Sequence, residues 1–183
     1  MLKPLLILDL DETLIYGSLK KLDRDSDFDV GPFMIYERPD LYYFLKTVSV
    51  FFDLAIWSSG TDDYVYGISF YLRKYFSEWK FIWGRKKCVA KMNFDTYETD
   101  YIKDLKIIKR FGFDLNRVLI VDDTPIKVSR NYGNAIYVKP FFGEKDDTEL
   151  QSLVIYLKHL LDFSDFRKVE KRGWRSKVLS LKD

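Results

Sequence analysis

Runs of apolar residues divide the chain into alternating strands and helices. The first run begins at Leu5, is continuously apolar, and ends in charge at Asp9. Continuous rather than alternating apolarity is typical of a strand buried on both faces, as in a parallel sheet covered by helices. Similar patterns predict further strands at residues 33–36, 50–57, 79–83, 117–121 and 134–138.

Between these strands, apolar residues recur at helical spacing. The spacing predicts helices that start near residue 39, at Thr61, at Ile102, after Thr124 and near Asp146. Strands that alternate with helices predict an α/β fold, a Rossmann-like parallel sheet with helices on both faces. Residues 16–32 are polar and are expected to form a small hairpin or a solvated insertion, whereas residues 84–100 look irregular and basic.

The composition indicates one soluble globular domain. The chain has 183 residues, of which 47% are hydrophobic and 32% are charged, enough for a real core. Its single cysteine, Cys88, excludes an intramolecular disulfide and fits a reducing compartment. No window of 18 apolar residues occurs, and Asp9 and Asp11 interrupt the first apolar run too early for a signal peptide. We therefore expect an intracellular, soluble protein, cytoplasmic or nuclear.

Positive charge is concentrated at the end of the chain. The net charge is +2, but residues 166–183 hold seven basic and two acidic residues, so this segment carries +5 and the rest −3. We therefore expect a domain over residues 1–165 and a basic tail over residues 166–183. The tail is interpreted as solvated or loosely packed, with steering of an acidic or anionic partner as the alternative. The modest total charge gives no reason to expect a direct nucleic-acid partner.

Two carboxylates follow the first strand at a spacing of two. Residues two apart in an extended chain point to the same side, so Asp9 and Asp11 are expected to share a small volume. The carboxyl ends of strands are where open α/β sheets bind ligands. Like charges this close need a cation or a shared proton, and one or two carboxylates are the usual protein ligands of Mg²⁺.

The segment Asp9-Leu10-Asp11-Glu12-Thr13 resembles the first motif of the haloacid dehalogenase superfamily. Over roughly residues 3–162, the order and spacing of motifs are similar to those of the small phosphatases that act on the C-terminal domain of RNA polymerase II. The resemblance implies that Asp9 is the nucleophile, that Asp11 is the general acid and then the base, and that Thr13 holds the loop by hydrogen bonds. The chain leaves no room for the large cap domain of many superfamily members.

Two later segments match positions that contact the phosphate in this family. Ser58 and Ser59 follow the strand at residues 50–57, and a hydroxyl there is able to donate to a phosphate oxygen. By the same resemblance, Arg85 contacts the phosphorylated substrate. Lys103 matches the lysine that offsets the charge of the carboxylate and the phosphate, with Lys106 and Lys109 as nearby alternatives.

The strand at residues 117–121 runs into Asp122-Asp123. By resemblance, these residues complete a Mg²⁺ site with the carboxylate of Asp9 and the backbone carbonyl of Asp11. Which of the two binds the ion directly is left open, although the resemblance favours Asp123. The sequence also predicts helix capping at this point, through Thr124.

These motifs together predict a Mg²⁺-dependent phosphoprotein phosphatase that forms an aspartyl-phosphate on Asp9, with phosphoserine or phosphothreonine favoured over phosphotyrosine. A small-molecule or nucleotide phosphatase is the alternative within enzymes, and a catalytically weak binding module of the same fold is the alternative outside them. A serine-hydrolase triad is excluded by inventory, because the only histidine is His159 and no Gly-x-Ser-x-Gly occurs.

Overall fold

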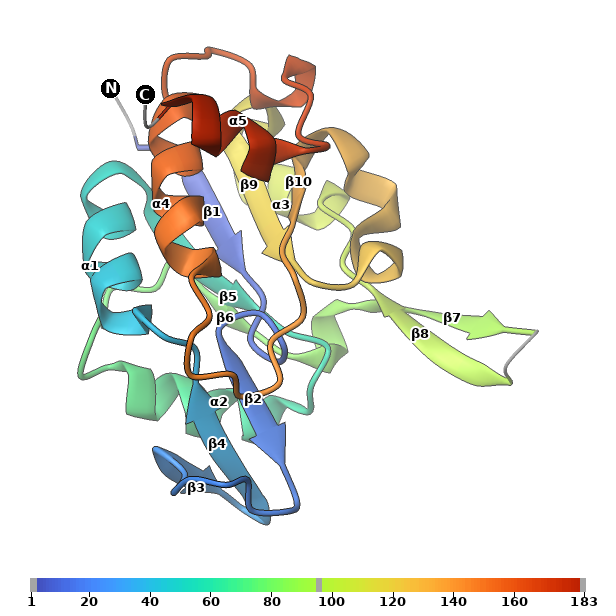
Figure 1. The fold of residues 1–183 in the computed structure, drawn as a ribbon. Coiled ribbons are helices and arrows are strands. Elements are labelled where there is room, and N and C mark those ends of the chain that lie inside the picture. The colour runs from blue at the N-terminus through green and yellow to red at the C-terminus, as the bar shows by residue number, and fades with distance from the viewer. Residues whose placement is uncertain (1–2, 95–96, 182–183) are drawn as a thin grey trace.

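A central parallel sheet organises the molecule (Figure 1). The structure is a computed structural model that describes residues 3–94 and 97–181. The strand order is β10-β9-β1-β5-β6, with β1 in the middle. The strands are β1 (Leu5–Leu8), β5 (Asp53–Trp57), β6 (Ile82–Trp83), β9 (Val118–Asp122) and β10 (Ala135–Tyr137). All the pairings in this sheet are parallel, so the carboxyl ends of neighbouring strands meet at one edge.

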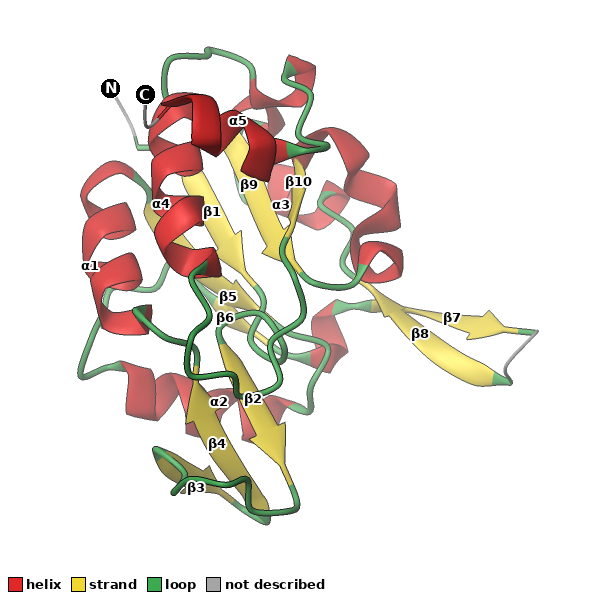
Figure 2. Cartoon of the chain, viewed as in Figure 1, coloured by secondary structure: helices red, strands yellow, loops and turns green. Residues whose placement is uncertain are grey.

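Helices cover both faces of this sheet, as the sequence predicts (Figure 2). Leu6 and Leu8 of β1 pack in a core with α1 (Leu41–Phe51), α2 (Asp62–Leu72), α4 (Glu149–Leu160) and α5 (Trp174–Leu181). Leu5 and Ile7 point to the other face and pack with α3 (Lys106–Arg110) and the 3-10 segment η3 (Pro125–Asn134). Alternate residues of β1 therefore serve two separate cores, and the predicted α/β architecture is confirmed.

Two small antiparallel units extend from this body. The strands β2 (Ile15–Ser18), β3 (Phe28–Val30) and β4 (Phe33–Glu37) form a three-stranded sheet in the order β2-β4-β3. A two-stranded hairpin, β7 (Val89–Asn93) and β8 (Glu98–Ile102), projects from the side of the molecule (Figure 1). The hairpin replaces the irregular segment expected at residues 84–100. Neither unit is large enough to act as a cap domain.

The helix predicted from Ile102 is wrong over its first turn. Ile102 ends β8, and α3 begins only at Lys106. Hydrogen bonds from distant residues hold the connection out of a helix, because the backbone N–H of Lys103 donates to the Lys127 carbonyl at 2.7 Å and that of Leu105 donates to Asn131 Oδ1 at 2.9 Å. Lys103 therefore lies on a connecting segment rather than on a helix face.

Other element boundaries shift by a few residues. The strand expected from residue 50 begins at Asp53, because α1 continues to Phe51. The helix expected to start at Thr61 spans Asp62–Leu72, with Thr61 as its N-cap. The segment after Thr124 is a 3-10 turn rather than an α-helix. The remaining 3-10 turns are η1 (Arg85–Lys87), η2 (Leu115–Arg117) and η4 (Phe166–Lys168).

The basic tail is packed against the core, so its interpretation as a solvated segment is wrong. Phe166, Trp174 and Val178 are each at most 2% exposed. The Trp174 indole stacks on Tyr156 with ring centroids 5.4 Å apart, and its Nε1 donates to the Tyr137 carbonyl at 2.9 Å. Apolar residues spaced among the charges bury the tail, which the count of charges does not show. The division of the chain at residue 165 stays a prediction.

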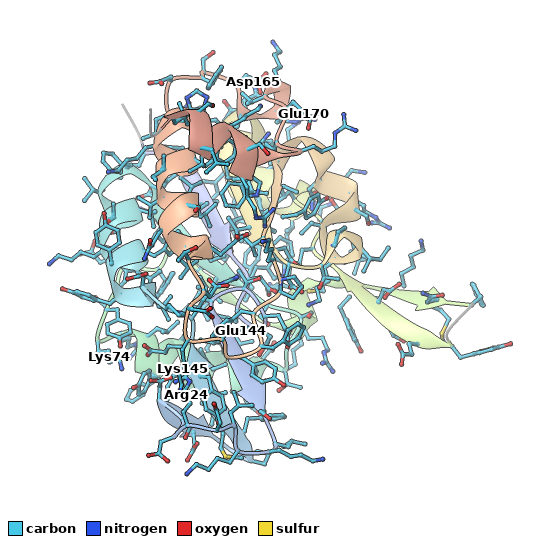
Figure 3. The ribbon with its side chains drawn as sticks, viewed as in Figure 1. Arg24, Lys74, Glu144, Lys145, Asp165 and Glu170 are labelled. Atoms are coloured by element: carbon cyan, nitrogen blue, oxygen red, sulfur yellow. The ribbon has the colours of Figure 1, made fainter. Side chains whose placement is uncertain are left out.

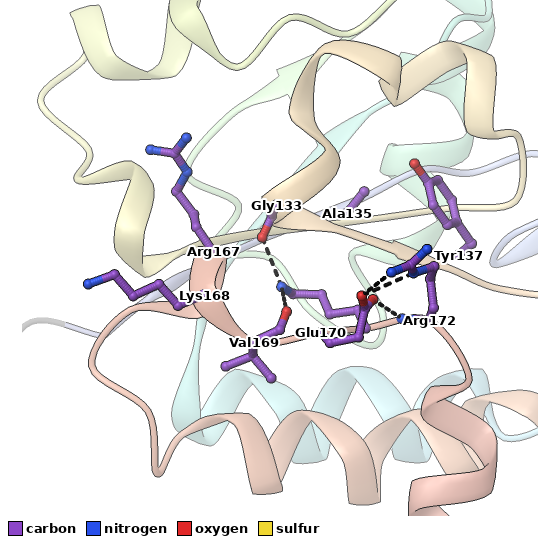
Figure 4. Close-up of a pocket in the computed structure, with 9 residues that line it drawn as sticks. Gly133, Ala135, Tyr137, Arg167, Lys168, Val169, Glu170 and Arg172 are labelled. Carbon is purple, nitrogen blue, oxygen red and sulfur yellow. Dashed lines mark hydrogen bonds and ion pairs between the residues drawn. The ribbon is translucent and has the colours of Figure 1, made fainter.

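Lys171 fixes the start of this segment. Its ammonium donates to the carbonyls of Gly133, Phe166 and Val169, which matches its three N–H groups. A pocket of about 150 Å³ lies beside it along β10, lined by Gly133, Ala135, Tyr137 and residues 167–172 (Figure 4). Because the Lys171 ammonium is bound to three carbonyl groups, at least part of the tail's positive charge is used internally. The acidic residues Asp165 and Glu170 lie in the same region, at the end of the molecule opposite Arg24 and Lys145 (Figure 3).

Helix α5 should contribute strongly to stability. We expect Trp174→Ala to lower the free energy of unfolding by about 3–5 kcal/mol, because it removes a buried aromatic ring and leaves a cavity. Urea denaturation followed by circular dichroism measures this change. Leu179→Ala, on the same helix but with Leu179 68% exposed, is the control and should change stability by less than about 0.5 kcal/mol. Equal stability of both variants would contradict the packing described.

Candidate functional site

Three neighbouring strands deliver polar side chains to one edge of the sheet. Asp9 directly follows β1, Ser58 directly follows β5, and Asp122 is the last residue of β9. Because β1 lies between β5 and β9 in a parallel sheet, these three residues meet at the carboxyl edge. Each is at most 1% exposed.

A buried ammonium, that of Lys103, lies between the carboxylates of Asp9 and Asp122. Lys103 Nζ lies 2.6 Å from Asp9 Oδ1 and 2.6 Å from Asp122 Oδ2. Burial lowers the pKa of Lys103, but Asp122 and Asp9 raise it by more, so the net pKa is above its ordinary value and the lysine stays charged. The alternatives Lys106 and Lys109 are exposed on α3. Lys103 is therefore the lysine that the structure brings to Asp9.

Carboxylate oxygens of Asp9, Asp122 and Asp123 lie within 4.8 Å of one another. Two buried oxygens in this group have no hydrogen-bond partner among the described residues, Asp9 Oδ2 and Asp123 Oδ1. Both oxygens of Asp122 are engaged, by Lys103 and by the Thr124 backbone N–H at 2.9 Å. Unpartnered carboxylate oxygens are the donors that a hard cation such as Mg²⁺ takes, so the residues present fit a divalent metal ion.

The Asp11 carboxylate points elsewhere. Its Oδ1 accepts a hydrogen bond of 2.5 Å from the Tyr64 hydroxyl, and its Oδ2 is 3.5 Å from Ser58 Oγ. Burial raises the pKa of Asp11 to about 6, although the Tyr64 hydrogen bond opposes this shift. The Asp11 side chain is outside the carboxylate group described above, and the metal contact expected through its backbone carbonyl stays a prediction.

A buried arginine holds the loop that carries Asp9 and Asp11. Arg38 donates to the Thr13 carbonyl at 2.9 Å, to the Lys139 carbonyl at 2.9 Å, and to both oxygens of Asp147 at 2.8 Å. Burial raises the pKa of Asp147, but the hydrogen bonds from Arg38, the Glu149 backbone N–H and the nearby positive charges together lower it by more, so the net pKa is below its ordinary value. The Thr13 hydroxyl has no hydrogen-bond partner among the described residues. The loop is therefore tied down through the Thr13 backbone rather than through its hydroxyl.

The segment after β5 forms a second wall of the site. The Ser58 backbone N–H donates to the Trp83 carbonyl at 2.9 Å, and Ser58 Oγ accepts from the Gly60 N–H at 3.0 Å. The Arg85 guanidinium donates from Nε to the Ser59 carbonyl at 2.8 Å and lies 4.5 Å from the centre of the Tyr101 ring. Arg85 is exposed, so it stands at the rim of the site and braces the backbone of Ser59.

Three residues of this site escaped the sequence analysis: Arg38, Tyr64 and Lys127. Lys127 Nζ lies 3.9 Å from Asp123 Oδ1. Tyr64 follows the predicted cap Thr61 by one turn of helix, and Arg38 precedes a predicted helix. Nothing in the local pattern distinguishes them from ordinary helix residues.

Comparisons with known proteins agree with this geometry. A family model described as NLI interacting factor-like phosphatase matches residues 4–167. A CTD nuclear envelope phosphatase 1 homolog of Drosophila melanogaster is 31% identical, over 92% of this chain and 72% of that protein. The human protein named carboxy-terminal domain RNA polymerase II polypeptide A small phosphatase 1 is 28% identical, over 89% of this chain and 61% of its own.

Solved structures share the fold. The structure of Fcp1, described as an essential RNA polymerase II CTD phosphatase, superposes with a TM-score of 0.57 over 98% of this chain and 49% of its own, at 18% identity. At that identity the likeness shows the fold alone, an α/β fold built on a central parallel sheet. With a family match over nearly its whole length, the chain belongs to the NLI interacting factor-like phosphatase family, a family of phosphoric monoester hydrolases.

Proposed function

We propose that this protein is a Mg²⁺-dependent phosphoprotein phosphatase that works through a phosphoryl group carried on Asp9. The observation that supports this most is the buried Lys103 ammonium, 2.6 Å from Asp9 and 2.6 Å from Asp122, beside carboxylate oxygens of Asp9 and Asp123 that have no hydrogen-bond partner among the described residues. Phosphoryl transfer depends mainly on positioning and on neutralising negative charge. A fixed cation beside a buried carboxylate supplies part of both requirements.

The same residues would hold the metal ion. We assign Asp9, Asp123 and the backbone carbonyl of Asp11 as its protein ligands, because Asp123 Oδ1 is buried without a hydrogen-bond partner while both Asp122 oxygens are engaged. Bound Mg²⁺ would neutralise negative charge that develops on the transferred phosphoryl group. Asp122 would instead orient Lys103.

The chain's own residues then have separate roles in two steps. Ser58 donates to a phosphate oxygen while Asp9 attacks phosphorus, and Asp11 gives its proton to the leaving oxygen. In the second step, Asp11 takes a proton from the water that releases phosphate from Asp9. A pKa of about 6 for Asp11 lies close to neutrality, as such an exchange of roles requires.

The substrate is proposed to be phosphoserine or phosphothreonine in a protein segment. The small antiparallel units leave no large cap over the site within the described residues, and Arg85 stands exposed at its rim. The relatives are named for the C-terminal domain of RNA polymerase II and for the nuclear envelope, which favours a nuclear substrate. None of the described helices has the length and apolarity needed to cross a bilayer.

Replacement of the nucleophile is the direct test of this function. Asp9→Asn should lower hydrolysis of a phosphoserine peptide at least about 10³-fold, since the amide keeps the shape but does not attack phosphorus. Asp63→Asn, at an exposed position in the first turn of α2, removes the same charge and should keep full activity. Circular dichroism should be unchanged in both. Undiminished hydrolysis by Asp9→Asn would reject Asp9 as the nucleophile.

Dependence on Mg²⁺ tests the metal site and distinguishes the two candidate ligands at the end of β9, Asp122 and Asp123. Chelation should abolish hydrolysis, and added Mg²⁺ should restore it. Asp123→Asn should raise the Mg²⁺ concentration needed for half-maximal activity about 10- to 100-fold, and calorimetry should show weaker Mg²⁺ binding. Asp122→Asn should lower activity at saturating Mg²⁺ with a smaller change in the Mg²⁺ requirement. A large rise in the Mg²⁺ requirement for Asp122→Asn and a small one for Asp123→Asn would instead assign the ion to Asp122.

A further inference from the structure

The Tyr64 hydroxyl is hydrogen-bonded to a carboxylate of the site, that of Asp11. Tyr64 lies in the first turn of α2, six residues after the strand-end Ser58. Its ring packs edge-on against Phe33, with the ring centroids 5.2 Å apart. The hydroxyl is 2.5 Å from Asp11 Oδ1. This contact joins α2 to the loop after β1, two segments that no strand pairing connects.

The direction of this hydrogen bond is fixed by charge. The Tyr64 hydroxyl carries a proton, whereas an ionised carboxylate offers only acceptor oxygens, so the tyrosine donates. Asp11 Oδ1 therefore acts as the acceptor. Its second oxygen, Oδ2, is left facing Ser58 Oγ at 3.5 Å, a distance too long for a strong hydrogen bond.

The surrounding chain leaves space for this hydroxyl. Gly17 of β2 lies beside it, and a Cβ at that position would stand 2.4 Å from the Tyr64 oxygen. Any side chain there would displace the hydroxyl from Asp11 or would itself have to shift. The absence of a side chain at Gly17 therefore leaves the room that the Tyr64 hydroxyl needs to contact Asp11.

We propose that Tyr64 is a positioning residue that fixes the Asp11 side chain so that Oδ2 carries the transferred proton. This rests on the proposed function. In the first step an oxygen–phosphorus bond forms to Asp9, and the bond between phosphorus and the ester oxygen breaks. The leaving oxygen keeps the electron pair and takes the proton from Asp11 Oδ2. Tyr64 holds Oδ1 throughout and keeps its own proton.

The leaving group distinguishes this role from a structural one. An alkoxide such as that of serine is a poor leaving group and needs the proton, whereas a dinitrophenolate leaves without it. Misplacement of the proton donor therefore slows only the first kind of substrate, and general loss of structure slows both. The ratio kcat/KM is the quantity to compare, because it covers only the steps up to phosphoryl transfer and excludes release of phosphate from Asp9.

The experiment compares Tyr64→Phe with Tyr71→Phe, using a phosphoserine peptide and dinitrophenyl phosphate in the presence of Mg²⁺. Tyr71 is on the same helix, and its hydroxyl also donates a hydrogen bond, to the Asp27 carbonyl at 3.0 Å. We expect Tyr64→Phe to lower kcat/KM for the peptide about 10- to 100-fold and for the dinitrophenyl ester less than about threefold. Tyr71→Phe should change neither.

A second variant should disrupt the same hydrogen bond while Tyr64 itself is kept. Gly17→Ala should produce the same selective loss on the peptide, and it should add little in the Tyr64→Phe background, where the hydroxyl is gone. Equal losses on both substrates in Tyr64→Phe, or no loss, would overturn the positioning role while leaving the proposed function intact. Wild-type protein that hydrolyses neither substrate would overturn both.

Discussion

The buried contact of Lys103 with Asp9 and Asp122 is the constraint on which the rest of the site depends. Two carboxylates at the ends of neighbouring strands repel each other away from water, and one ammonium between them offsets that cost. Removal of one partner from a buried ion pair costs about 3–5 kcal/mol, because the remaining charge is left uncompensated. The connection before α3 is held out of a helix by hydrogen bonds to Lys127 and Asn131, and Lys103 reaches the sheet edge from it.

A second buried cation, Arg38, holds the loop that carries Asp9 and Asp11. Arg38 ties the Thr13 carbonyl to Asp147 and Lys139, so the segment after β1 is fixed to the segment between β10 and α4. Rigid support of this kind matters because catalytic groups lose effect when displaced by about 1 Å. The two cations have different roles. Lys103 sets the charge around Asp9, and Arg38 sets the position of its loop.

How much of this the sequence could predict depends on the range of the interactions involved. The buried strand β1 is a local pattern and was sufficient for the α/β fold. The grouping of Asp9 with Asp122 and Asp123 came from the family resemblance, whereas local spacing alone paired Asp9 with Asp11, whose side chain lies outside that group. The extended segment at Lys103 was missed because distant hydrogen bonds override helical spacing there. Tyr64 was missed because its role exists only through its contact with Asp11. The tail was misread because Trp174 and Val178 are sparse among the charges that dominate its composition.

The central claim, that phosphate is carried on Asp9, is tested most directly by trapping the intermediate. Wild-type protein would be mixed with a phosphoserine peptide and Mg²⁺ and quenched in acid during turnover. Borohydride would then convert an acyl-phosphate to an alcohol, and peptide mass spectrometry would locate it. The account predicts reduction at Asp9, dependent on substrate and absent when Mg²⁺ is chelated. Turnover with no modified residue, or with reduction at a different carboxylate, would contradict it.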